Sequence, residues 1–399
     1  MGRWVAPVVL VLCFAGEPAR AAERQFRYNG GLSEVWSQDA LRVGDKQNDD
    51  YITSLSLEGI FEVRTPRTES SFSFAPSYYV YATYSDLNHL DHRYRGSYQF
   101  SPGRRSTFSL DQGFSDVTRQ NGFGDLAGAG SEAGQPIIGL TRVTAWTLEP
   151  TWRLAASPDA SYTVRGTVRS ESYESDDFID SDQYGLETSG DYRVGRRYTL
   201  GYNVRGDRFT YSEGNATQQL PYERFFSLGM RWGLKEGDQF QVTASAGAFR
   251  GEGNGLDPAT GPTAGVAGQW HWRRTDLTVG YGLGFSSGGG LSSADRSHRA
   301  DVNYAVRFGG GYEARFGGDY ILREPLNRAD VNTLEGRSLS AGLDRRWQSG
   351  WGMTAGVSGL RQQQDQGTDL AYIEAMVGAT FRSPTRPRYS PPQAPPPGG

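Results

Sequence analysis

Apolar and polar side chains alternate along most of this chain with a period of two residues. The segment 51–64 is the clearest case, because Leu55 and Leu57 fall on one face while Ser56 and Glu58 fall on the other. Such a period predicts a β-strand with one apolar and one polar face, since successive side chains of a strand point to opposite sides. The same pattern recurs along the chain and predicts about 18 strands.

The connections between the expected strands alternate in length along the chain. Short turns such as 65–67 and 348–350 alternate with longer polar loops such as 120–139. This rhythm indicates antiparallel hairpins with both chain ends on the short-turn side. In the strand expected at about 70–83, Pro76 lacks a backbone donor, so we expect a β-bulge there.

The apolar faces are rich in aromatic residues that gather towards the strand ends. In hydrocarbon only a closed sheet satisfies every backbone group, and aromatic girdles mark its two interfaces. We therefore predict an all-β fold, a transmembrane antiparallel β-barrel with short periplasmic turns and longer extracellular loops. A soluble sandwich or propeller is the alternative, but it would not need so even a series of apolar faces. The expected lipid-facing residues include Trp146, Leu148, Trp152, Tyr202, Leu228, Met230, Val279 and Tyr304.

Composition narrows the class of protein further. Only 37% of residues are hydrophobic while 13% are aromatic, and no stretch after the N-terminus approaches the length of a membrane-spanning helix. A helix bundle in a membrane is therefore excluded. The formal net charge is −4, so there is no basic surplus of the kind that nucleic-acid binding needs.

The two ends differ in composition from the region between them. Residues 1–21 have the features of a cleaved secretory signal, with a short apolar core before the small residues of a cleavage site. Cys13 is the only cysteine, so after cleavage we expect no disulfide and no thiolate site. Residues 22–382 would form the barrel. Residues 383–399 are proline-rich, which indicates an extended, disordered periplasmic spacer or a segment that docks a partner.

The polar face of the expected barrel carries both signs of charge, with arginine prominent. Burying so many charges in a dry barrel would be costly, so we expect a lumen that holds water, as an 18-strand barrel can. The arginines either stabilise the barrel wall through rows of Arg–Glu ion pairs or contact a hydrated polar solute, including an anionic one, as it passes. The expected lumen-lining residues are Arg153, Arg165, Arg169, Arg205, Arg307, Arg315, Arg323, Arg346, Glu149 and Asp319.

No constellation of residues indicates catalysis or a cofactor. His89 and His92 lie near Asp91, which suggests a metal or an Asp–His pair, but loop residues of these types are usually only solvated. The acidic segments 45–50 and 176–182 lack the spacing of a calcium loop. We therefore expect no enzyme activity, no metal and no cofactor.

The segment 370–381, LAYIEAMVGATF, alternates and ends in an aromatic residue. It resembles the closing strand of bacterial outer-membrane β-barrels, a resemblance that implies an outer-membrane location and recognition by the barrel-assembly machinery. That family usually ends on the aromatic residue itself, whereas here Arg382 and a tail follow Phe381.

With its arginine-rich lumen and no visible plug, the chain also resembles polysaccharide-export barrels of the alginate-exporter kind and of Wzx/Wzy-type secretion. This resemblance implies outward passage of a secreted polysaccharide, handed over by a periplasmic export protein. The alternatives are a general diffusion porin with 120–139 as its pore loop, a channel specific for sugars or fatty acids, and a structural anchor or adhesin. An outer-membrane enzyme is the least favoured, because no nucleophile–base pair is visible.

Overall fold

A computed structural model describes residues 23–40, 48–118, 141–175, 179–213, 223–237, 239–253, 256–286, 295–325, 333–364 and 369–383. These residues form one 18-stranded sheet in which every pairing is antiparallel. The expected signal segment, most of the tail and the loop 120–139 lie outside the described residues. The strands are β1 (Glu23–Ser37), β2 (Asp50–Arg64), β3 (Thr68–Tyr81), β4 (His89–Gly103), β5 (Ser106–Thr118), β6 (Arg142–Ala155), β7 (Ala160–Tyr173), β8 (Ile179–Val194), β9 (Tyr198–Glu213), β10 (Glu223–Glu236), β11 (Phe240–Gly253), β12 (Leu256–His271), β13 (Thr275–Ser286), β14 (Asp295–Arg307), β15 (Tyr312–Pro325), β16 (Leu334–Arg346), β17 (Trp351–Gln364) and β18 (Asp369–Arg382).

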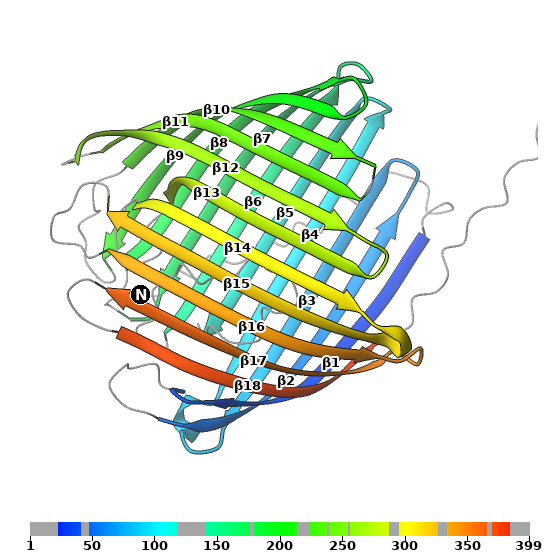
Figure 1. The fold of residues 1–399 in the computed structure, drawn as a ribbon, viewed down its shortest axis with the longest axis vertical. Helices are drawn as coiled ribbons and strands as arrows, with labels where there is room; N and C mark the ends of the chain where they lie inside the picture. Colours follow the sequence, from blue (N-terminus) through cyan, green and yellow to red (C-terminus); the bar gives the residue numbers. More distant parts are fainter. Residues whose placement is uncertain are drawn as a thin grey trace, which may run out of the picture.

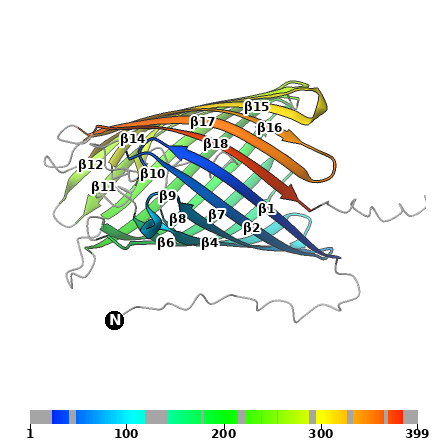
Figure 2. The ribbon, with the colours of Figure 1, turned by 90° about the horizontal axis from the view of Figure 1, so that it is seen from below.

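The sheet closes on itself between the first and the last strand. β1 pairs with β2 on one side and with β18 on the other, from Asn29 opposite Arg382 to Ser37 opposite Glu374. Figure 2 shows β1 and β18 lying next to each other. Every strand then has two neighbours, and the predicted antiparallel β-barrel is confirmed.

The short turns lie at one rim of the barrel, here called the turn-side rim, and the long connections lie at the other, the loop-side rim. At the turn 348–350 the chain reverses over a residue with φ of +90°, Gly350. A Cβ there would lie 2.3 Å from the carbonyl oxygen of Arg382, so only glycine fits. β1 begins and β18 ends at this same rim.

The bulge that we expected at Pro76 is absent. β2 and β3 lose their pairing opposite Ala75 and Pro76, but Ser56 opposite Ser77 and Gly59 opposite Phe74 belong to one unbroken register. No residue is inserted, because the ladder only skips the positions that the proline leaves without a donor.

β12 begins earlier than the sequence pattern predicts, at Leu256 rather than near residue 264. Its pairing with β11 reaches back to Leu256, whereas its pairing with β13 ends at Ala264 opposite Leu283. Figure 1 shows β12 running on beyond the end of β13. The first part of β12 therefore lacks its second neighbour.

Large apolar side chains cover the outside of the barrel. Leu228 is 52% exposed and Met230 is 71% exposed, and both occupy alternate positions on β10. Trp146 is also exposed, as we expected for a lipid-facing residue. Within the described ranges, no helix is long and apolar enough to cross a membrane.

The inner face of the barrel is polar, apart from small apolar clusters towards the loop-side rim. One of these clusters contains Phe209, Phe225 and Phe249, which are all buried. A closed antiparallel barrel with a lipid-compatible outside and a polar inside is the architecture of outer-membrane proteins. The chain is therefore an outer-membrane β-barrel, as the closing strand led us to expect.

Candidate functional site

A charged row crosses the inner wall on three consecutive strands. Arg165 of β7 lies directly opposite Glu187 of β8, which in turn lies opposite Arg205 of β9. Directly opposed side chains of an antiparallel pair are close neighbours, and opposite charges there contribute roughly 0.2–1 kcal/mol per pair. The register thus places a carboxylate between two guanidinium groups on the lumen wall.

Arg205 is held by two hydrogen bonds to one carboxylate. Its Nε donates to Oδ2 of Asp207 at 2.6 Å and its Nη2 donates to Oδ1 at 2.9 Å. Asp207 also accepts from Nε2 of Gln183 at 2.9 Å, and its side chain is fully buried. The fork of bonds fixes the guanidinium plane, while the Arg205 side chain remains 37% exposed to the lumen.

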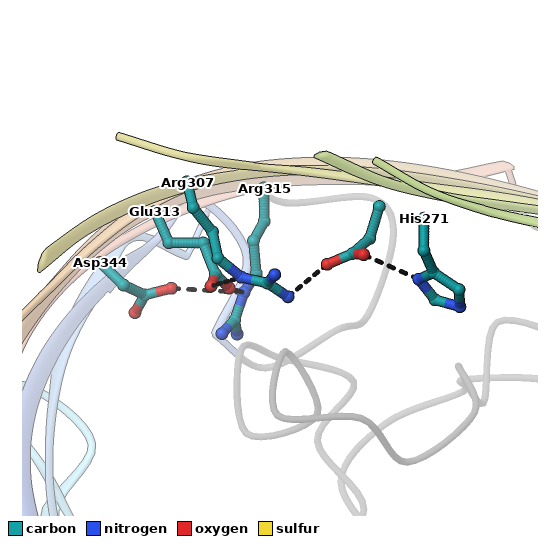
Figure 3. A network of polar contacts seen from close by, with 6 residues as sticks. His271, Arg307, Glu313, Arg315 and Asp344 are labelled. Atoms are coloured by element: carbon teal, nitrogen blue, oxygen red, sulfur yellow. Dashed lines mark hydrogen bonds and ion pairs between the residues drawn. The ribbon is translucent and has the colours of Figure 1, made fainter. Parts of the chain in front are cut away.

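A longer chain of alternating charges runs along the turn-side rim on β12 to β16 (Figure 3). His271 lies 2.8 Å from Asp276, whose other oxygen pairs with Arg307. Nε of Arg307 lies 3.3 Å from Glu313, which also accepts from Arg315 at 2.6 Å. Nε of Arg315 lies 3.5 Å from Asp344, which ends the chain.

Figure 3 shows these side chains leaving the wall towards the inside of the barrel. Arg307 and Arg315 each lie between two carboxylates, so neither sign dominates along this stretch of the wall. Arg307 is still 54% exposed, which leaves its guanidinium group accessible to a solute in the lumen. The arrangement can both brace the wall and offer hydrogen-bond donors to a hydrated anion.

Two other predicted arginines form ion pairs near the loop-side rim. Arg169 pairs with Glu171 of the same strand, which is buried, while Arg169 itself remains partly exposed. Arg323 approaches Asp295 at 4.0 Å, and both side chains are nearly buried. The second pair links the ends of the neighbouring strands β15 and β14.

Asp319 on β15 lies within the wall between two neighbours. Nη2 of Arg299 comes within 3.8 Å of its carboxylate, and the Ser338 hydroxyl donates to it at 3.3 Å. Asp319 therefore also contributes to bracing the wall.

A recess of about 470 Å³ lies in the inner wall near the turn-side rim. Arg231 pairs there with Asp191, and Lys235 lies nearby. Arg153 and Arg193 also line the recess, and among the described residues neither has an ion-pair partner. This part of the turn-side rim, on β6 to β11, is therefore more basic than the part on β12 to β16 shown in Figure 3.

All ten predicted lumen residues occupy register positions on the polar inner face, including Glu149 opposite Asp111 and Arg346 opposite Gly352. Their part in transport stays a prediction. We did not single out Glu187, Asp207 or Asp276, which supply partners to the predicted arginines. The sequence pattern could have identified them, because the same alternation that puts Leu277 on the outer face puts Asp276 on the inner face.

The histidine cluster considered for a metal has another role. His89 stacks on Tyr79 with ring centroids 4.8 Å apart, and its Nε2 lies 3.7 Å from Asp91. Asp91 accepts the backbone N–H of Thr118 at 2.8 Å, so it secures a strand end. The part of the chain that the structure describes holds no group of three or more His, Cys, Asp or Glu residues able to bind a metal.

The first acidic segment is described only from residue 48 onwards. Its last member, Asp50, is buried and accepts the backbone N–H groups of Thr83 and Tyr84. Asp50 thus caps a neighbouring connection. Asp45 and residues 176–178 lie outside the described residues.

No protein-family model matches the sequence, and no curated protein matches it. Among solved structures, OccK2 (OpdF) of Pseudomonas aeruginosa is 11% identical over 90% of this chain and 97% of its own, with a TM-score of 0.48. The outer membrane protein OpdK of the same organism is 10% identical over 90% and 99%, with a TM-score of 0.45. OccAB3 of Acinetobacter baumannii is 13% identical over 90% and 100%, also at 0.45.

At these low identities and TM-scores the likeness is one of general architecture and says nothing about the solute. The resemblance to polysaccharide-export barrels finds no support in these comparisons.

Proposed function

We propose that this protein is a water-filled outer-membrane channel through which small polar solutes diffuse passively, with a preference for anions. The observation that carries the proposal is the inner wall, on which half-exposed guanidinium groups line the lumen at several heights. Arg205 and Arg307 are the best-defined examples. An 18-strand barrel is wide enough to leave an aqueous passage between its walls.

The preference for anions follows from how the charges are paired. Most acidic side chains described above already accept hydrogen bonds from the wall, so their negative charge is balanced locally. Arg153 and Arg193 have no such partner within the described ranges. A basic, low-dielectric opening concentrates anions near the turn-side rim.

Export of a polysaccharide is the other function that we expected from the sequence. It needs a partner in the periplasm that delivers the polymer, and the segment considered for docking it, residues 384–399, lies outside the described residues. Nothing on the described wall favours a polymer over a small solute. We also infer that the barrel is not an enzyme, since no nucleophile–base pair lines the described lumen.

Planar-bilayer recording tests the proposal. We expect steady conductance and a reversal potential that favours chloride over potassium across a salt gradient. Changing Arg153→Glu together with Arg193→Glu should shift the selectivity towards cations. The matched control is Arg337→Glu with Arg361→Glu, an equal change of charge on two directly opposed residues of the outer face.

A protein that folds but conducts no more than the bare bilayer would overturn the proposal. If such a protein were nonetheless required for surface polysaccharide, export would replace diffusion as its function. If Arg153→Glu with Arg193→Glu left the ion selectivity unchanged, the basic opening would not be its cause.

A further inference from the structure

The barrel wall is incomplete between β12 and β13 near the loop-side rim. Pairing between them ends at Ala264 opposite Leu283, although β13 continues to Ser286. On its other side β13 stays paired with β14 as far as Ser286 opposite Asp295, and β12 stays paired with β11. The two strands thus separate from each other while each keeps its outer neighbour. We call this gap the β12–β13 seam.

A proline explains why the ladder stops there. The N–H of His271 donates to Gln239 on the β11 side, and that of Trp272 donates to Thr275 on the β13 side. Backbone N–H groups alternate along a strand, so the even-numbered residues of β12 direct their N–H groups towards β13 as far back as the register with β11 holds, at Ala259. Pro262 is even-numbered and has no N–H to donate.

In a continued register Pro262 would lie opposite Phe285. The last pair forms two positions before this point, at Ala264. The sequence of β12 thus removes a donor on the edge that opens, whereas the edge towards β11 stays paired in one register as far as Ala259.

Beyond the seam, the end of β13 has moved to the inside of the wall. By alternation Phe285 belongs to the outer face, together with Tyr281. Its ring nevertheless stacks on Phe225, with centroids 4.7 Å apart, and contacts Phe249 at 5.3 Å. Both partners are buried on the inner face. The outer face of this strand end therefore lies against the inner face of β10 and β11.

A recess of about 430 Å³ adjoins the seam. One side is apolar and the other is polar, with Arg205 beside uncharged amides and hydroxyls. Its volume falls within the usual range for sites that bind small molecules. Its apolar lining includes Phe209, Ala264, Leu283 and Phe285, and its polar lining includes Gln183, Asn203 and Arg205.

The open edge of β12 is a poor template for a partner strand. Strand addition needs donors and acceptors in turn, and position 262 offers only an acceptor. Proline on an edge is one of the devices by which proteins prevent such pairing. A route for a small molecule fits the edge and the adjoining recess better than a docking site for a second polypeptide.

We propose that the β12–β13 seam is a lateral portal, through which an amphipathic anion passes between the recess and the outer leaflet of the membrane. The apolar body of the molecule packs against Leu283 and Phe285, and its anionic group faces Arg205 and Asn203. This route is separate from the proposed diffusion of polar solutes along the barrel axis.

Photolabelling tests the portal with a diazirine-bearing analogue of decanoate and the full-length barrel in lipid vesicles. We expect labels on the segments 260–264 and 283–286, mapped by mass spectrometry. Unlabelled decanoate should compete with the probe, whereas gluconate, an anion without an apolar body, should not. Labels confined to the outer face would overturn the proposal.

Restoring the missing donor should close the seam. We expect Pro262→Thr to lower labelling about two-fold or more, because one added hydrogen bond favours the paired edge. Pro150→Thr is the control, since it changes a proline of β6 away from the seam. Conductance for small anions should stay the same in both variants. If amide exchange shows that the edge of β12 has become protected while labelling is unchanged, the portal is refuted.

Two double-cysteine variants test the portal if Pro262→Thr prevents folding. Thr263→Cys with Gly284→Cys joins the two sides of the seam on oxidation, and a Cβ added at Gly284 meets nothing within 4 Å. Oxidation should block labelling and reduction should restore it.

The control is Gly284→Cys with Ser297→Cys, which joins a pair that is already opposed and should leave labelling unchanged. Disulfides between two copies of the chain through Thr263→Cys would make the edge an interface and overturn the portal. A barrel that is labelled but does not conduct would leave the portal standing and refute the diffusion channel instead.

Discussion

Two strand pairs of this barrel, the closed β1–β18 seam and the open β12–β13 seam, contradict what chain connectivity alone would suggest. β1 and β18 come from opposite ends of the sequence, yet they pair along an unbroken register. β12 and β13 are joined by a tight turn, yet they separate after Ala264. The difference lies in the supply of backbone donors, because β18 has no proline while β12 has Pro262 on the edge that opens. A closed wall thus depends on hydrogen-bond donors more than on proximity in sequence.

The largest effect should come from removing a donor from the closed seam. Ser383 donates to Tyr28 on β1, so odd-numbered residues of β18 direct their N–H groups towards β1. Val377→Pro should therefore weaken closure by about 3 kcal/mol or more. Urea unfolding in detergent, followed by heat-dependent gel mobility, measures the loss. Val377→Thr keeps the donor and should unfold close to the wild type, and equal losses in both would refute the argument.

A smaller loss should follow from the buried carboxylate that lies within the closed seam. Glu374 is 1% exposed and accepts from the Ser37 hydroxyl at 3.3 Å. Glu374→Ala should cost about 1–3 kcal/mol, because it leaves polar neighbours without their acceptor. The same unfolding experiment measures this, with Glu335→Ala as the control, a partly exposed carboxylate of the outer face. A wild-type midpoint for Glu374→Ala would mean that the backbone ladder alone holds the seam.

The open seam should respond less to a side-chain deletion. Phe285→Ala removes the stack on Phe225 and should cost about 0.5–1.5 kcal/mol. We also expect faster amide exchange at the end of β13 and no change in β1 or β18, as hydrogen–deuterium exchange would show. Faster exchange around the whole barrel would mean that the aromatic contact supports the wall rather than the seam.

The smallest change in stability should come from giving the open seam its donor back. Pro262→Thr should add about 0.5 kcal/mol, the net value of one hydrogen bond after the unfolded chain gains freedom. Slower amide exchange in the segment 260–264 is the direct measurement. No gain in protection there would mean that Phe285, and not Pro262, keeps the strands apart.

Much of this architecture follows from local pattern, because the period of two residues is visible in each strand separately. The same alternation places Arg307 inside and Val306 outside without knowledge of any neighbour. The partners are a different matter. Arg307 meets Asp276, which is 31 positions away in sequence, only because β13 and β14 pair in one particular register.

The first part of β12 shows where the pattern stops being informative. Its residues 256–263, LDPATGPT, have no alternation of apolar and polar types, so the pattern predicts a strand that begins only near residue 264. β11 nevertheless pairs with this segment on both sides of a register shift and holds it extended. The local sequence carries no information about a partner strand that is brought in by long-range pairing. The β12–β13 seam could not be predicted from the sequence for the same reason.

The shared rim at which β1 begins and β18 ends has a practical meaning. Short turns of such barrels face the periplasm, so a tag fused to either end of the barrel stays inside the cell envelope. Antibodies added to intact cells would then bind only to an epitope inserted into one of the long connections at the opposite rim.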